Sequence, residues 1–132
     1  MSPDLARQRL NDLRNGLLRL HKTILDSEAA RYDRDIKRIT SRSQLFGLVL
    51  NDPWFAWLHD LSELIVLIDE TLAAEQPATN DDAARLVTQA RGLLLPAETG
   101  QGFSRQYFEA LQRDPDIVVA HGEMMRIFSQ LG

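Results

Sequence analysis

The sequence predicts an all-α protein, a four-helix up-down bundle with two short accessory helices. Apolar residues recur at the three- and four-residue spacing of helices, and no stretch alternates apolar and polar residues as a strand does. Short connections separate the long helical segments, which favours antiparallel packing of neighbours. With 132 residues, of which 44% are hydrophobic, the chain is predicted to form one domain spanning residues 1–132.

The first helix is predicted to begin at Ser2, its N-cap, with Pro3 at the first helical position, and to run to about Ile39. At about 1.5 Å per residue it would be about 55 Å long, which is too long for a compact domain of this size. We therefore expect Gly16 to bend the helix or one end to project. Its core stripe consists of Ala6, Leu10, Leu13, Leu17, Leu20 and Ile24.

Prolines and capping residues divide the rest of the chain. Ser43 can cap a short helix over 43–51, and Asn51 and Asp52 before Pro53 favour the end of that helix and the start of another. The second long helix is predicted over 53–75, the third over 81–95, a short helix over 103–113 and the last over 115–131. Asp114 and Pro115 repeat the Asp-Pro pair at the start of the last helix.

The helix over 53–75 has an apolar face and a mixed back face. At about 100° per residue, its inward stripe contains Trp54, Trp57, Leu58, Leu61, Leu64, Ile65, Ile68 and Leu72. His59 and Glu63 then lie opposite that stripe, and Phe55, Val66 and Leu67 flank them. The back face is either a solvated surface or a second contact surface, for another helix or for a second subunit. We predict an interface of Phe55, His59, Glu63, Val66 and Leu67, used in a homodimer or with a protein partner.

The stripe of the first helix becomes polar halfway along the helix. Its continuation contains His21, Glu28, Arg31, Tyr32, Asp35 and Ile39. Buried charges must be paired or hydrated, so two interpretations follow. In the first, this half of the helix projects beyond the bundle or forms an ion-pair network with a crossing helix. In the second, it lines a polar pocket. The pocket candidates are His21, Glu28, Tyr32 and, at the edge of the core face of the last helix, His121.

A metal site is the sharper form of the pocket hypothesis. Imidazole and carboxylate ligands suit zinc, iron or manganese, and His21, Glu28 and His121 could hold a single divalent metal if the first and last helices are antiparallel neighbours. The Glu-x-x-His motif of di-iron bundles is absent from the sequence. His59 and Glu63 have a helical metal-site spacing, but they point away from the core. No other cofactor is predicted.

Several classes of function are disfavoured by composition. The chain has no cysteine, no G-x-S-x-G nucleophile motif and no phosphate-binding glycine loop. Its net charge of -4 and the absence of a polybasic block disfavour nucleic-acid binding. The longest strictly apolar run, LIVLI, is too short to cross a membrane, and the N-terminus lacks the apolar core of a signal peptide, so we expect a cytoplasmic protein.

Three segments, LHKTILDSE, DPWFAWLHDLSELIVLIDE and LQRDPDIVVAHGE, resemble an uncharacterised bacterial family of small helical proteins. The resemblance implies a helical bundle and no activity. We therefore expect a non-enzymatic bacterial protein that acts through protein contacts. The alternative is a bundle that binds a metal or small ligand in the polar pocket.

Overall fold

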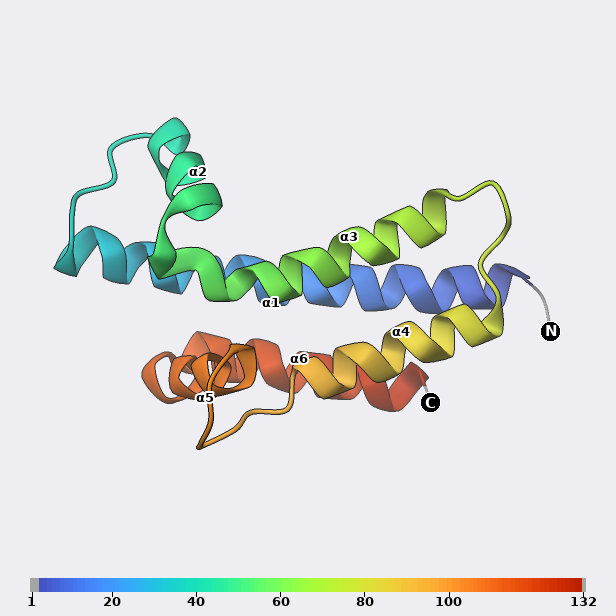
Figure 1. Cartoon of the computed structure of the whole chain (residues 1–132). Coiled ribbons are helices and arrows are strands. Elements are labelled where there is room, and N and C mark those ends of the chain that lie inside the picture. The colour runs from blue at the N-terminus through green and yellow to red at the C-terminus, as the bar shows by residue number, and fades with distance from the viewer. Residues whose placement is uncertain (1–2, 132) are drawn as a thin grey trace.

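Helices follow one another along residues 3–131, which are the residues that the computed structural model describes (Figure 1). They are α1 (Pro3–Asp35), α2 (Arg42–Asn51), the 3-10 helix η1 (Pro53–Leu58), α3 (His59–Ala73), α4 (Asn80–Leu93), α5 (Phe103–Arg113) and α6 (Pro115–Leu131). No strand occurs among them, which confirms the all-α class. The predicted cap Ser2 lies outside the described residues.

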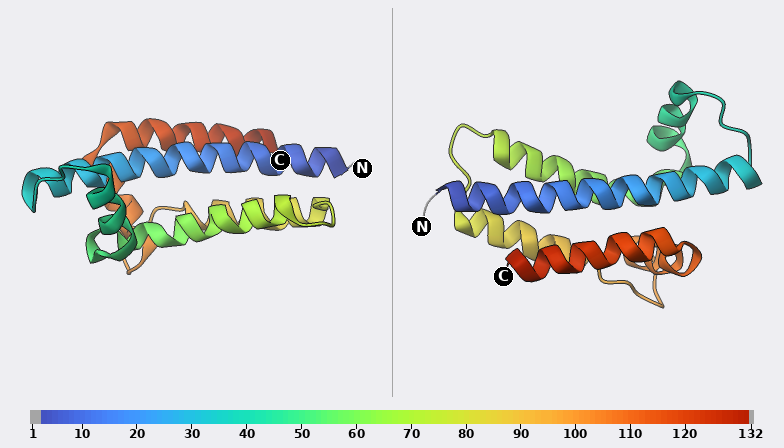
Figure 2. Two further views of the ribbon diagram at one scale, coloured as in Figure 1. Left: turned by 90° about the horizontal axis from the view of Figure 1, so that it is seen from above. Right: turned by 180° about the vertical axis from the view of Figure 1, so that it is seen from behind.

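The long helices α1, α3, α4 and α6 run side by side, and each reverses the direction of the one before it (Figure 1). Helix α1 contacts the other three, and α6 lies alongside it in both views of Figure 2. The short helices α2 and α5 lie near the end of the molecule at which α1 finishes, α2 beside η1 and α5 beside α6. Within residues 3–131, we find no helix with the length and apolar character that a membrane crossing requires.

The predicted stripe of α1 is the centre of the core. All six of its apolar residues, Ala6, Leu10, Leu13, Leu17, Leu20 and Ile24, are buried. Burial of one such leucine or isoleucine side chain stabilises a fold by about 1.5–3 kcal/mol relative to exposure. Because the stripe faces three helices at once, α1 organises the packing of the others.

Helix α1 ends four residues earlier than predicted and runs through Gly16 without interruption. Asp33 accepts a hydrogen bond from the backbone N–H of Ile39 at 2.7 Å, and this local side-chain contact competes with continuation of the helix. Gly16 instead allows close approach of α6. A Cβ at this position would lie 2.6 Å from Ile127 Cδ1 and 2.7 Å from Met124 Sδ.

The predicted second long helix is divided, and this division corrects the position of Phe55. Residues 53–58 form η1, in which side chains three positions apart eclipse because the turn has about three residues. Phe55 and Leu58 therefore share one direction, and Phe55 is 0% exposed. Trp54 and Trp57, predicted inside, are only partly buried. The projection at about 100° per residue failed here because it assumed an α-helix.

The two Asp-Pro pairs begin helices in the same way. Asp52 Oδ1 accepts the N–H of Trp54 at 2.9 Å, and Asp114 Oδ1 accepts the N–H of Asp116 at 2.9 Å. Each carboxylate thus satisfies a backbone donor that has no partner inside the helix. Helix α4 starts with a capping box between Thr79 and Asp82. The Asp-Pro pairs thus begin η1 and α6 as predicted, whereas the cap of α2 is Ser41 rather than the predicted Ser43.

We expect Gly16→Leu to lower the free energy of unfolding by about 1–3 kcal/mol, because the added side chain must displace Ile127 and Met124. The control is Gly122→Leu in α6, where a Cβ meets no atom within 4 Å. That variant should be as stable as the parent or more stable, since leucine is the better helix former. Urea unfolding followed by circular dichroism measures both. Equal stability of the two variants would contradict the close approach of α1 and α6.

Candidate functional site

The four residues of the predicted polar pocket lie in three separate clusters. Glu28 is in an ion-pair cluster, and Tyr32 belongs to an aromatic group next to it. His21 contacts α3 instead, and His121 contacts α5. Among residues 3–131, no three His, Asp or Glu side chains are arranged to hold a metal ion. The structure therefore does not bring the predicted metal ligands together.

Glu28 is buried, with 3% of its surface exposed, and its charge is neutralised by two arginines. Its Oε1 accepts hydrogen bonds from Arg31 Nη1 at 3.1 Å and Arg113 Nη2 at 2.9 Å. Its Oε2 lies 3.5 Å from the indole Nε1 of Trp57. The polar half of the α1 stripe thus forms an ion-pair network with the crossing helix α5. This is the first of the two interpretations of the sequence, rather than a polar pocket.

Tyr32 belongs to an aromatic group beneath α2 rather than to a polar pocket. Its ring centroid is 5.8 Å from that of Trp54 and 5.8 Å from that of Phe55. Arg31 lies over the Trp54 ring at 4.6 Å, and the Trp54 indole donates to the backbone carbonyl of Glu28 at 3.2 Å. Such edge-on ring packing and cation–π contact fix side chains firmly. This group attaches η1 to the second half of α1.

The two candidate histidines are each held by one hydroxyl group. His21 Nε2 lies 2.9 Å from Ser62 Oγ, and His121 Nδ1 lies 2.7 Å from the Tyr107 hydroxyl. Burial lowers the pKa of both histidines because it disfavours the charged imidazolium. Burial also raises the pKa of Tyr107, so its hydroxyl stays protonated and can donate to His121. Both pairs are therefore hydrogen bonds at the boundary of the hydrophobic core.

The predicted interface face of α3 is exposed apart from Phe55. Val66 and Leu67 are exposed hydrophobic residues, and His59 and Glu63 are exposed beside them. These four residues also line a shallow depression of about 420 Å³. His59 Nε2 is 3.2 Å from the Val49 carbonyl oxygen, which connects this face to the end of α2. Phe55 was predicted to be exposed here, and that prediction is wrong.

Helix α2 is an apolar surface that the prediction missed. None of its residues is buried, although five of its ten residues are large and aliphatic or aromatic. Phe46 is 66% exposed and Leu50, one turn later, is 53% exposed. The available sequence signal was the segment LFGLVL, which is apolar all round the helix rather than along one stripe. We call the exposed pair Phe46 and Leu50 the α2 surface.

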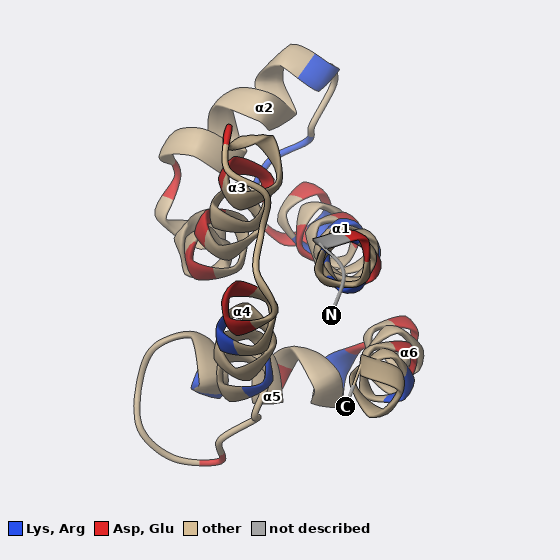
Figure 3. Ribbon diagram, turned by 90° about the vertical axis from the view of Figure 1, so that its right-hand side faces the viewer, with Lys and Arg blue, Asp and Glu red and all other residues tan. Residues whose placement is uncertain are grey.

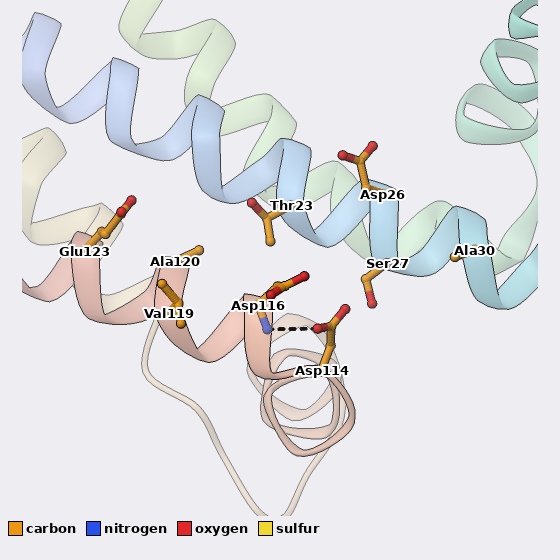
Figure 4. A pocket seen from close by; sticks show the side chains of 9 residues that line it. All are labelled: Thr23, Asp26, Ser27, Ala30, Asp114, Asp116, Val119, Ala120 and Glu123. Carbon is orange, nitrogen blue, oxygen red and sulfur yellow. Dashed lines mark hydrogen bonds between the residues drawn. The ribbon is translucent and has the colours of Figure 1, made fainter.

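A groove of about 510 Å³ lies between α1 and α6 (Figure 4). Four carboxylates line it, from Asp26 on α1, Asp114 before α6, and Asp116 and Glu123 on α6. The Asp114 carboxylate is held by the backbone N–H of Asp116, as the dashed line in Figure 4 shows. The carboxylates are spread along the groove and, as stated above, form no metal-binding group.

We expect Arg113→Met to reduce the free energy of unfolding by about 1.5–3 kcal/mol, the usual contribution of a hydrogen bond to a charged group. The substitution leaves buried Glu28 with Arg31 as its remaining cation. Arg85→Met is the matched control, because it breaks an ion pair with Asp82 in which Arg85 is 68% exposed. Its effect should be much smaller. Similar losses in urea unfolding of the two variants would contradict a structural role for the Glu28 cluster.

Stability should fall as the pH decreases below 6.5, the ordinary histidine pKa. Because the pKa of folded His21 and His121 is lowered, the unfolded chain takes up protons first and is favoured in acid. Their contribution is fully present above that pH. Urea midpoints between about pH 5 and pH 7.5 should depend less on pH in His21→Gln/His121→Gln than in the parent. An unchanged pH dependence in the double variant would refute burial of the two imidazoles.

No protein-family model, curated protein or solved structure matches the chain. The similarity to an uncharacterised bacterial family therefore stays a prediction.

Proposed function

We propose that this protein is a non-enzymatic interaction module, a four-helix up-down bundle with two accessory helices that associates with a second copy of itself through the α2 surface. The single observation in support is the exposure of Phe46 and Leu50 on a helix with no buried residue. A helix normally derives most of its stability from packing an apolar face. Helix α2 packs Leu45, Leu48 and Val49 partly against the core and leaves Phe46 and Leu50 in solvent within one chain.

The chemistry of α2 suits contact with an identical helix. From Ser43 to Asn51 it has no charged residue, so two copies can meet without like-charge repulsion. Figure 3 shows a charged residue on α2 only at its start, which is Arg42. Gly47 lies beside Phe46, and a Cβ there would meet no atom within 4 Å. Two helices can therefore approach closely at this point.

The outer face of α3 extends the proposed interface. His59, at the start of α3, contacts the end of α2, and Val66 and Leu67 follow along the same helix. Phe55 has no part in it, because its side chain is in the core. The alternative function, a metal or small-ligand pocket of His21, Glu28, Tyr32 and His121, has no comparable support, since these residues lie in separate clusters.

Sedimentation velocity of the parent and of Phe46→Asp tests the proposal. We expect a dimer for the parent and a monomer for the variant, because a carboxylate at the centre of an apolar contact would be buried without a partner. Val118→Asp is the control, since Val118 is also exposed but lies on α6. It should remain dimeric.

Two results would overturn self-association through α2. One is a parent protein that sediments as a monomer at every protein concentration measured. The other is equal dissociation of both variants with the helical content of the parent, which would place the contact elsewhere or make it nonspecific. Circular dichroism of each variant tests whether its helical content is retained. This control separates dissociation of a folded dimer from unfolding of the chain.

A further inference from the structure

A further cavity, of about 350 Å³, lies where α1 meets α5 and the start of α6, separate from the α2 surface. It is lined by Ser27, Ala30, Arg31, Arg34, Arg113 and Asp114. Three of these six residues are arginines, although the chain as a whole has a net charge of -4. We propose that this cavity binds the phosphate group of a small anionic ligand.

Two of the arginines are held in position from beneath. Glu28 accepts one hydrogen bond from Arg31 Nη1 and one from Arg113 Nη2, and Arg31 also stacks on Trp54. The carboxylate is 3% exposed, so it acts as a buried anchor rather than as a competing surface anion. Guanidinium groups that are fixed before binding lose little conformational entropy when a ligand arrives.

These two guanidinium groups keep unused donors. Each has five N–H donors, and among the described residues we find no protein acceptor for Arg31 or Arg113 other than Glu28. Arg34 is less available, because its Nε and Nη2 both donate to Asp35. The side chain of Ser27 points from α1 toward Asp114 across the groove and offers a hydroxyl (Figure 4).

The lining of the cavity is richer in arginines than in carboxylates. It contains three arginines and one carboxylate, that of Asp114. Asp114 Oδ1 accepts the Asp116 N–H as the cap of α6, which directs part of its negative charge to the helix start. Arg34 is neutralised by Asp35, and Glu28 lies beneath the other two arginines, so the pull on an anion comes from the free donors of Arg31 and Arg113 rather than from a surplus of positive charge. The acidic groove of Figure 4 shares Ser27, Ala30 and Asp114 with this cavity and limits the anion to its arginine end.

A phosphate group fits this arrangement better than a carboxylate. A carboxylate is planar and is bound best by one guanidinium that donates two parallel hydrogen bonds. Here the two anchored guanidinium groups come from different helices, α1 and α5, so their free donors suit an anion with several acceptor oxygens. The phosphate could be free or carried by a small organic molecule as a monoester. Both sources present the same oxygens to Arg31 and Arg113.

Two-dimensional NMR titrations at low salt test the site, with inorganic phosphate, glycerol 3-phosphate and succinate as separate probes. Low salt is required because contacts between arginine and phosphate are screened by ions. We expect phosphate to shift the Nε–H signals of Arg31 and Arg113 and the amides of Ser27, Ala30 and Asp114. Tighter binding of the glycerol ester identifies a monoester as the ligand, and tighter binding of inorganic phosphate identifies the free ion. Both results support the proposal.

The decisive variant is Glu28→Gln/Arg113→Gln, which removes one positive and one negative charge and leaves the net charge of the chain unchanged. It should weaken phosphate binding about tenfold, the effect of losing one charged hydrogen bond. Arg85→Gln on α4 is the control and should bind as the parent does. Unchanged affinity in the double variant, shifts scattered over other surfaces, or tighter binding of succinate would overturn the proposal. If the double variant unfolds, the proposal is tested by the parent protein alone. The test is then which of its NMR signals phosphate shifts.

Discussion

The burial of one continuous stripe on α1 is the constraint on which the rest of the structure depends. Its first half, from Ala6 to Ile24, faces α3, α4 and α6 and is closed to solvent. A helix of 33 residues can serve three partners because its length exceeds that of any of them. The absence of a side chain at Gly16 further lets Ile127 and Met124 of α6 lie close to α1. Each later helix is therefore positioned by what α1 presents to it.

The second half of α1 replaces apolar packing with a neutralised charge. Glu28 occupies the position at which the stripe would otherwise continue into the core, and a buried carboxylate is unfavourable unless it is paired. Arg31 supplies one partner from the next turn, and Arg113 supplies the other from α5. The crossing of α5 beside the second half of α1 is thus linked to a single carboxylate. The same pairing fixes the guanidinium groups that line the proposed anion cavity.

Local patterns allowed much of the fold to be predicted, but not the contacts between distant segments. The α1 stripe and the helix starts at Asp52, Thr79 and Asp114 follow from spacing and capping, which involve residues within one or two turns. Phe55 was misplaced because nothing local distinguished a 3-10 turn from an α-helix after the proline. Helix α1 was extended too far because the Asp33 contact with Ile39 depends on a specific loop conformation.

The candidate sites were harder to predict for the same reason. Glu28 and His121 stood out in the sequence as polar residues on or beside an apolar stripe. The residues that bind them could not be identified in the same way. Arg113 lies 85 positions after Glu28, and Tyr107 lies 14 positions before His121. A polar residue on an apolar stripe indicates that a partner is needed without indicating which residue supplies it. Pocket and ion-pair network were therefore both compatible with the α1 sequence alone, and the ion-pair interpretation was the one it favoured.

The two proposed surfaces are connected through η1. This segment contacts α2 on one side and α5 on the other. Its Trp54 and Trp57 indoles both reach Glu28, the first at the backbone carbonyl and the second at the carboxylate. Binding free energies at two sites are coupled only if each site shifts the same element, and the coupling is then reciprocal. Because Glu28 lies on α1, a shift of η1 would act on it only through these two indole contacts, and any resulting change in anion affinity would be matched in dimer affinity. If η1 remains rigid, the two surfaces act independently.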